Sequence, residues 1–161
     1  MKMILTADLC DAYMPNLKVV KPIGFKNYGK KNSFCGQIVT VKVFEANELI
    51  RAILEEDGNG KVLVVDGGGS DRRALVGGNI AAMAQENGWS GVIINGAIRD
   101  VLEIAEVDMA VLALYSNPYR SAKELQGERD LTLHFADADF VPGQFIYADE
   151  DGIVLSEKEL S

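Results

Sequence analysis

Residues 61–70 read KVLVVDGGGS, and the order of residue types in this stretch decides the fold class. Lys61 to Val65 is a short, mostly β-branched run of the kind that forms a buried strand. Asp66 and three glycines then turn the chain, and a helix is predicted from about Arg73 to Asn87. A buried strand followed by a turn and a helix is the first half of a βαβ unit, so we expect parallel strand pairing here.

The same order of elements continues downstream. Gly91 to Ile94 is a second buried apolar run, which Asn95 and Gly96 end, and a second helix is predicted from about Arg99 to Ala105. Met109 to Leu114 is a third apolar run. Because connections between parallel strands are short and right-handed, we expect the three strands to form the parallel central section of one sheet.

The segments on either side of this section follow other patterns. Thr6 is expected to cap a short helix that ends before Pro15. Phe34 to Phe44 alternates as a half-buried strand does, and Asn47 is expected to cap the helix that follows. Short strands are predicted towards the C-terminus at Thr132–Phe135, Phe140–Val141, Phe145–Ala148 and Ile153–Leu155. The predicted fold is α/β, a single domain over residues 1–161 with a parallel central section and a C-terminal β layer.

Composition and charge exclude several classes of protein. Of the 161 residues, 48% are hydrophobic and 25% are charged, which is typical of a globular domain. The formal net charge of −8 disfavours direct binding of nucleic acid or anionic lipid, and no apolar run approaches the ~20 residues that cross a bilayer. Cys10 and Cys35 lack CxxC spacing and no signal peptide is evident, so we expect packed, reduced thiols in a cytoplasmic protein.

Two loops leave the carboxyl ends of successive predicted strands, which is where open α/β sheets bind ligands. The first covers residues 66–73 and the second covers residues 95–100. If their strands are neighbours, Arg99 and Asp100 lie beside glycine-rich backbone at one edge of the sheet. Arginine offers a planar fork for a carboxylate and aspartate offers a hard oxygen for a divalent cation. This pairing predicts an anion site beside a cation site.

The glycines of the first loop allow several interpretations. Gly67 and Gly69 have the spacing of a dinucleotide-binding loop, but Arg72 occupies the third glycine position, and no GxxxxGK motif occurs. A methyltransferase that uses S-adenosylmethionine fits better, because a strand ending in Asp66 precedes the glycines, yet the next strand ends in Asn95 instead of an acidic residue. A turn that only lets strand and helix pack closely is an equally good interpretation.

Other polar residues near these loops are weaker candidates. Arg72 and Arg73 are either local cations of the site or solvated surface residues. His134 has no Cys or His at metal-ligand spacing, which favours a packed or edge histidine over a catalytic one. A polar loop is predicted over residues 116–130, and three residues that flank it are candidates for the mouth of a cleft: Tyr115, Tyr119 and Arg120.

A motif in the second half of the chain resembles a known family. Twenty residues separate Gly78 from the pair Arg99 and Asp100, and two more separate Asp100 from Glu103. This spacing resembles the Gly-x20-Arg-Asp-x2-Glu/Asp motif of the RraA-like proteins, which are grouped with the 4-hydroxy-4-methyl-2-oxoglutarate aldolases. The likeness extends over most of the chain, through residues 8–11, 64–68, 149 and 151–153. The resemblance implies a swivelling β/β/α domain assembled as a homotrimer, with active sites between subunits.

The resemblance also implies roles for single residues. The backbone amides that hold the substrate carboxylate would come from Gly77, Gly78, Asn79 and Ile80. Arg99 would be the catalytic residue that binds the 2-keto acid, Asp100 would ligate Mg²⁺ or Mn²⁺, and Glu103 would hold metal-bound water. Some aldolases of the family carry a carboxylate where this chain has Gly78. This difference is expected to affect the strength of metal binding and the substrate preference.

Two functions follow from the resemblance. The first is a divalent-metal-dependent aldolase that cleaves 4-hydroxy-4-methyl-2-oxoglutarate to pyruvate, with oxaloacetate decarboxylation as a side activity. The second is a non-catalytic regulator that binds and inhibits ribonuclease E, since an acidic trimer can attract a basic segment of such a partner. A regulator has no need of a metal-ligating aspartate, so Asp100 favours the enzyme.

Overall fold

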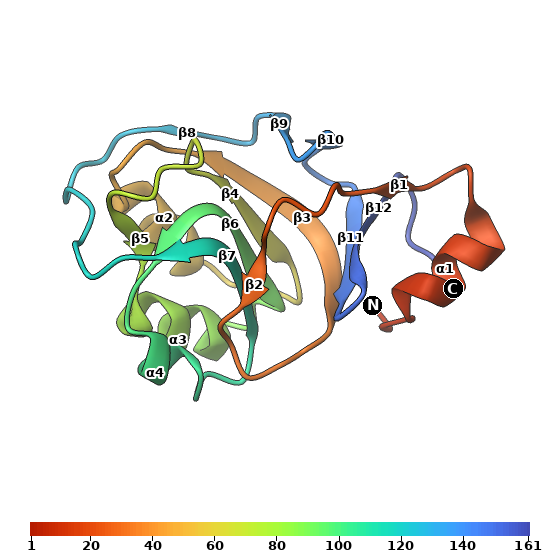
Figure 1. Cartoon of the computed structure of the whole chain (residues 1–161), viewed down its shortest axis with the longest axis horizontal. Helices are drawn as coiled ribbons and strands as arrows, with labels where there is room; N and C mark the ends of the chain where they lie inside the picture. The colour runs from red at the N-terminus through yellow and green to blue at the C-terminus, as the bar shows by residue number, and fades with distance from the viewer.

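The computed structural model describes residues 1–161 and shows a mixed α/β fold (Figure 1). The helices are α1 (Thr6–Tyr13), α2 (Glu48–Leu54), α3 (Gly78–Glu86) and α4 (Val101–Ile104). The strands are β1 (Lys18–Val19), β2 (Lys26–Asn27), β3 (Phe34–Lys42), β4 (Val62–Asp66), β5 (Ala74–Val76), β6 (Gly91–Ile98), β7 (Ala110–Ser116), β8 (Glu128–Arg129), β9 (Leu133–Phe135), β10 (Ala138–Phe140), β11 (Phe145–Asp149) and β12 (Gly152–Ser156). None of these helices is long and apolar enough to span a membrane.

The parallel central section is confirmed. Strands β3, β4, β6 and β7 are parallel neighbours, and β4 pairs with β6 from Val62 opposite Gly91 to Asp66 opposite Asn95. All residues of β4 and β6 are buried, because both faces of the sheet are covered. Leu63 of β4 packs with the apolar sides of α2, α3 and α4, whereas the next residue, Val64, joins a second core on the opposite face.

The C-terminal β layer is also confirmed. Strand β11 is antiparallel to both β3 and β12, and β9 and β10 form a separate two-stranded hairpin. Their apolar side chains supply much of the second core, including Phe140 and Ile146. Figure 1 shows α1 beyond β11 and β12, on the side of the molecule away from α2, α3 and α4. The fold therefore leaves α2 to α4 and the adjoining loops to form the surroundings of Arg99.

The two predicted helix caps are wrong, because neither Thr6 nor Asn47 caps its helix with its side chain. Helix α1 begins after Leu5, and Thr6 is its buried first residue. The Thr6 amide and hydroxyl donate to the two carboxylate oxygens of Asp149, at 2.8 and 2.6 Å, so a residue distant in sequence caps this helix. Asn47 does precede α2, but its side chain donates to the Leu75 carbonyl instead of capping the helix.

The helix predicted from Arg73 begins five residues later than expected. Ala74 to Val76 form β5, which pairs in parallel with β6. Tertiary pairing holds this segment extended, because the Ala74 amide donates to the Tyr119 carbonyl and the Ala74 carbonyl accepts from the Ser121 amide. Helix α3 then begins at Gly78. This shift matters for function, because it places the amino end of α3 beside Arg99 and Asp100.

Candidate functional site

The end of β6 positions Arg99 and Asp100. The Arg99 amide donates to the Val76 carbonyl at 3.0 Å, which ties the residue after β6 to the end of β5. Asp100 has φ 60° and ψ 49°, a left-handed conformation that aspartate tolerates better than most residues do. A non-glycine residue held in this region costs on the order of 1–3 kcal/mol, and such strain is common at functional sites. The conformation turns the chain sharply from β6 into α4.

Two carboxylates lie against the turn at Gly77 and Gly78. Asp100 Oδ2 accepts a hydrogen bond from the Gly78 amide at 2.8 Å. A Cβ atom on Gly77 would lie 2.7 Å from the same oxygen, and a Cβ atom on Gly78 would overlap Glu103 Oε2. Glycine is therefore required at both positions by close approach, since a larger residue would displace one carboxylate or the other. The structure brings together the residues that the motif separates by twenty positions.

A pocket of about 200 Å³ opens beside this turn. Its lining includes five of the seven residues singled out above: Gly77, Asn79, Ile80, Arg99 and Asp100. Gly78 and Glu103, which lie against each other, are not part of the lining. The first turn of a helix leaves its amides without acceptors within the helix, and one of them, that of Gly78, is already used by Asp100. The amides of Asn79 and Ile80 are the ones left to meet an anion.

Charged side chains from two further segments, α2 and the loop after β7, complete the pocket. Arg51 of α2 lines it together with Arg120 and Lys123 of the loop after β7, and Glu48 adds one carboxylate. Arg120 was a candidate for the mouth of a cleft, and it does line the pocket, whereas Tyr115 and Tyr119 do not. Arg51 and Lys123 were missed. No motif marks them, because only the packing of α2 against the loop after β7 brings them to this pocket.

The carboxylates at the turn fit a hard, largely hydrated cation. Asp100 uses Oδ2 for the Gly78 amide, which leaves its other oxygen for a metal, and Glu103 stands at the adjoining glycine. No group of three or more His, Cys, Asp or Glu side chains is arranged to hold a metal ion. Mg²⁺ binds through one or two carboxylates and keeps several waters, so this donor set suits Mg²⁺ or Mn²⁺ better than a metal that needs a complete protein cage.

The other glycine loop is closed by its own hydrogen bonds. The amides of Gly67 and Gly69 both donate to the Asn95 carbonyl, at 3.0 and 3.1 Å, and the Gly68 amide donates to Asp66 Oδ1 at 2.9 Å. Asn95 Nδ2 donates to the same Asp66 oxygen at 3.0 Å. These amides have no capacity left for a phosphate or a cofactor. The geometry supports the interpretation of this loop as a packing turn, and it supports neither dinucleotide nor methyl-donor binding there.

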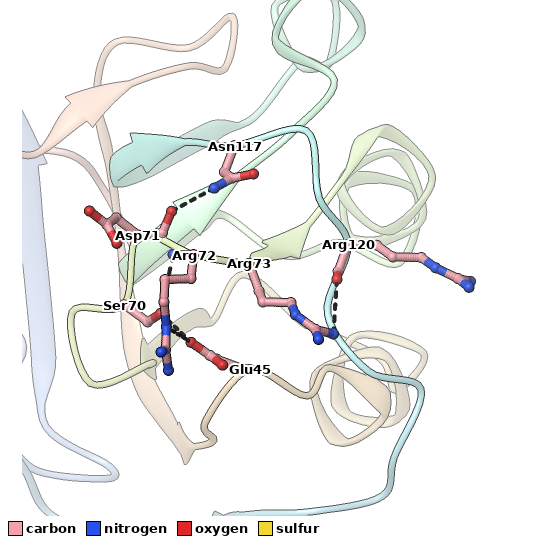
Figure 2. A network of polar contacts seen from close by, with 7 residues as sticks. All are labelled: Glu45, Ser70, Asp71, Arg72, Arg73, Asn117 and Arg120. Carbon is pink, nitrogen blue, oxygen red and sulfur yellow. Dashed lines mark hydrogen bonds and ion pairs between the residues drawn. The ribbon is translucent and has the colours of Figure 1, made fainter.

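Arg72 does not reach the pocket. Its Nε atom lies 2.8 Å from Glu45 Oε2, and the Ser70 hydroxyl donates to the same oxygen at 2.7 Å (Figure 2). The hydrogen bond from Ser70, followed by the hydrogen bond and charge of Arg72, lowers the pKa of the Glu45 carboxyl. Of the two interpretations given for Arg72, the structure supports that of a surface residue, and its contact with Glu45 helps to hold the closed glycine loop.

Arg73 also lies outside the pocket and instead holds the loop after β7. Its guanidinium carbon is 4.2 Å from the centre of the Tyr119 ring, and Nη1 donates to the Arg120 carbonyl at 3.4 Å. On the same loop the Asn117 side chain donates to the Asp71 carbonyl at 2.7 Å. Figure 2 shows the two hydrogen bonds, from Arg73 to Arg120 and from Asn117 to Asp71, joining the two loops. Arg73 thus fixes the backbone that carries Arg120.

A larger hollow lies elsewhere on the molecule. It has a volume of about 900 Å³, lies between the segment around β1 and the β9–β10 hairpin, and shares no residue with the Arg99 pocket. His134 lines it and contacts Asp139 at 2.6 Å, but both side chains are about 70% exposed. His134 is an edge residue of the hairpin. Neither an arginine nor the amino end of a helix lines it, so the smaller pocket is the better candidate for binding an anionic substrate.

The cysteines pack as expected of small apolar residues. Cys35 is buried in a cluster with Leu9 and Tyr147, and Cys10 packs against the same cluster. Burial raises the pKa of the Cys35 thiol, which disfavours its reactive thiolate form.

Comparison with known proteins gives one family. The model of the family described as "RraA-like: Aldolase/RraA" matches residues 6–155. A protein from Aromatoleum aromaticum named "Putative 4-hydroxy-4-methyl-2-oxoglutarate aldolase" is 52% identical over 155 residues, which cover 96% of this chain and 97% of that protein. A protein from Arabidopsis thaliana with the same name, numbered 1, is 49% identical over 166 residues and covers 100% and 99% of the two chains.

Solved structures share the fold over nearly the full length. The RNA-processing inhibitor RraA from Thermus thermophilis superposes with a TM-score of 0.94 at 46% identity, covering 99% of this chain and 96% of that one. A structure from Geobacillus kaustophilus described as S-adenosylmethionine:2-dimethylmenaquinone methyltransferase has a TM-score of 0.95 at 46% identity, covering 98% and 97%. The names of these relatives differ, so the residues of the pocket have to decide between the functions.

Proposed function

Because the chain belongs to the RraA-like family, we propose that it is a divalent-metal-dependent lyase that cleaves 4-hydroxy-4-methyl-2-oxoglutarate to pyruvate and also decarboxylates oxaloacetate. The names of relatives about half identical to this chain over its full length support a lyase. One observation carries the proposal: Asp100, Arg99 and the amino end of α3 converge on one pocket. A protein that acts only by binding another protein does not need this arrangement.

The amino end of α3 and Arg99 are suited to hold a 2-keto acid. The amides of Asn79 and Ile80 would bind the carboxylate beside the keto group, favoured by the partial positive charge of a helix N-terminus. Arg99 would donate to the keto oxygen, where negative charge develops as the bond breaks. Apart from the Pro118 carbonyl, at 3.5 Å from Nη1, no protein acceptor competes for its guanidinium. The guanidinium is therefore available to a ligand.

Asp100 and Glu103 are the residues that would hold the cation. Asp100 would ligate it directly through the oxygen not bonded to Gly78, and Glu103 would hold one of its waters. The bound cation would supply positive charge near the keto oxygen of the substrate. The hydrogen bond from the Gly78 amide orients the Asp100 carboxylate, so less ordering is needed when the ligand binds.

The atoms and electrons of the proposed cleavage balance without a further reactant. The hydroxyl group on C4 of 4-hydroxy-4-methyl-2-oxoglutarate loses its proton and becomes a ketone as the C3–C4 bond breaks. The electron pair of that bond passes to C3 and the keto group, and C3 then takes up a proton. Both fragments are pyruvate. In oxaloacetate the same carbon, C3, retains the electron pair when carbon dioxide leaves.

We also propose a homotrimer with the pocket near a subunit interface. Leu102 of α4 is 85% exposed and Val101 is 39% exposed, and both follow Asp100 directly. Exposed apolar side chains beside a functional site are typical of surfaces that another protein covers. The mass in solution, measured by light scattering after gel filtration, tests this assembly, and a monomeric mass contradicts it.

The test of the proposed activity is pyruvate release from 4-hydroxy-4-methyl-2-oxoglutarate and from oxaloacetate. Removal of divalent ions with EDTA is expected to abolish both reactions, and Mg²⁺ or Mn²⁺ is expected to restore them. Arg99→Lys should lower kcat/KM by at least about tenfold, since a lysine ammonium cannot reproduce the planar fork. Arg72→Lys, a matched change outside the pocket, should leave kcat/KM unaltered. Full activity after complete chelation contradicts the metal-dependent lyase.

A second candidate function is inhibition of ribonuclease E, and the RNA-processing inhibitor from Thermus thermophilis supports it at 46% identity. The net charge of −8 would favour contact with a basic segment of that enzyme. Cleavage of a short RNA by ribonuclease E, measured with increasing amounts of this protein, tests the candidate. Inhibition that persists in Asp100→Asn would assign it to a surface other than the pocket, and RNA cleavage at an unchanged rate would contradict it.

A further inference from the structure

The pocket contains more positive charge than its proposed chemistry uses. Arg99 and Asp100 carry opposite formal charges at the end where the 2-keto acid would bind. Three further cations line the same pocket against one further carboxylate, Glu48; these cations are Arg51, Arg120 and Lys123. Three positive charges against one negative charge leave an excess of two, in a chain whose net charge is −8. Such a local excess favours a ligand with a second negative charge.

These charges are not used within the protein. The ion pairs of the chain involve other residues, and neither Arg51, Arg120, Lys123 nor Glu48 takes part in one. None of the four side chains makes a hydrogen bond to another side chain. Within one chain, a ligand anion therefore has no carboxylate to displace from these cations.

Two of these cations, Arg51 and Lys123, lie on the side of the pocket that continues onto α2. Arg51, Lys123 and Glu48 also line a shallow hollow along α2 that contains neither Arg99 nor Asp100. They therefore stand where the pocket continues onto α2. A ligand held by Arg99 at one end would point its other end towards them. The pocket volume of about 200 Å³ is below the roughly 300–1,000 Å³ typical of sites for drug-sized ligands, so both ends belong to one small molecule.

Arg120 is held in place by its backbone while its guanidinium remains free. The neighbouring Tyr119 carbonyl accepts from the Ala74 amide at 2.7 Å, and the Ser121 amide and hydroxyl donate to the Ala74 carbonyl at 3.0 and 2.8 Å. Arg73 donates to the Arg120 carbonyl at 3.4 Å. Figure 2 shows the Arg120 side chain extending away from Arg73, with no interaction drawn at its guanidinium. A fixed backbone reduces the ordering cost of binding an anion here.

We infer that Arg120, with Lys123 and Arg51, forms a second anion subsite that binds the far carboxylate of a 2-keto dicarboxylate. The inference rests on the proposed function for the near end of the ligand, which Arg99 and the amino end of α3 would hold. Arg120 is then the residue that distinguishes diacids from monoacids, because its planar fork matches a carboxylate with two parallel hydrogen bonds.

Binding of two unreactive ligands of equal length tests the subsite. Isothermal titration calorimetry in the presence of Mg²⁺ gives the Kd of 2-oxoglutarate and of 2-oxopentanoate, in which a methyl group replaces the far carboxylate. The protein should bind the diacid at least about tenfold more tightly, as expected for a hydrogen bond to a charged group. Arg120→Gln should reduce this preference at least about fivefold. Lys30→Gln, which removes an exposed cation outside the pocket, should leave it unchanged.

The results separate this inference from the proposed activity. An equal loss of affinity for both ligands in Arg120→Gln, or an unaltered preference for the diacid, overturns the subsite. Pyruvate release from 4-hydroxy-4-methyl-2-oxoglutarate is measured on the same preparation of the unmodified protein. Absence of pyruvate contradicts the lyase, while the ratio of the two Kd values still decides for or against the subsite.

Discussion

Two glycine turns follow the carboxyl ends of parallel strands and differ in where their amides are used. After β4, the amides of Gly67, Gly68 and Gly69 all donate to Asn95 or Asp66. After β5, Gly77 and Gly78 lead into α3, and only the Gly78 amide is taken, by Asp100. The first turn has more glycines, yet the second one lines the pocket. Glycine content alone therefore does not identify a ligand site.

The difference has a physical cause. A glycine turn that leads into the first turn of a helix presents amides without intrahelical acceptors, and these amides can bind an anion. A glycine turn whose amides reach a neighbouring strand stabilises the fold and has no donor left. Substitutions in the first turn should therefore reduce stability, whereas substitutions in or beside the second should reduce activity.

The largest expected effect is that of Asp100→Asn. Asparagine also tolerates the left-handed conformation and can still accept from the Gly78 amide, so the fold should be retained. Loss of the negative charge should lower kcat for pyruvate release by about 10²–10³-fold, as expected for removal of one strong electrostatic contact. Steady-state kinetics beside a melting curve measure both quantities. A variant with normal turnover would remove Asp100 from the proposed chemistry.

Gly77→Ala should reduce activity more than stability. Gly77 has φ −118°, which alanine adopts without strain, but the new methyl group would lie 2.7 Å from Asp100 Oδ2. The carboxylate must move, and a displacement of about 1 Å at a catalytic group can cost about 10²-fold in rate. The midpoint of thermal unfolding should change little, because the atom that must move belongs to an exposed side chain.

Gly67→Ala is the matched variant in the closed turn and should show the opposite result. Its methyl group would lie 2.5 Å from Leu75 Cδ1 and 2.9 Å from the Asn95 carbonyl oxygen, and Leu75 is buried in the core. We expect a loss of stability of about 1–3 kcal/mol with kcat/KM near normal. Urea unfolding followed by the fluorescence of the single, buried tryptophan, Trp89, measures the stability. If Gly67→Ala loses activity and not stability, the assignment of the two turns is wrong.

The smallest expected effect concerns the pH dependence of the closed turn. The pKa of Glu45 is lowered in the folded protein, first by the hydrogen bond from Ser70 and then by Arg72. Its contribution to stability is therefore present above the unfolded pKa and is lost as the pH falls through the folded pKa. Glu45→Gln should be less stable than the unmodified protein at pH 7, and the difference should shrink at pH 3. A difference that stays constant with pH would contradict this assignment.

The α/β class, the parallel central section and the C-terminal β layer could be predicted from local sequence patterns. Those features follow from local patterns, since buried strands such as β4 and β6 require continuous apolar runs whatever surrounds them. The spacing from Gly78 to Arg99, Asp100 and Glu103 was visible for the same reason, because a motif depends on order along the chain.

The backbone groups and the cations that reach the pocket could not be predicted in this way, because contacts between distant segments place them there. Pairing of β5 with β6 and with the Tyr119 segment moved the start of α3 from Arg73 to Gly78. The same pairing turned Arg73 away and placed Arg120 in the lining. Residues such as Arg51 and Arg120, 69 positions apart in the numbering, share no local pattern. They meet because hydrogen bonds and core packing between distant segments set their positions, and these interactions leave no periodic signal in the sequence.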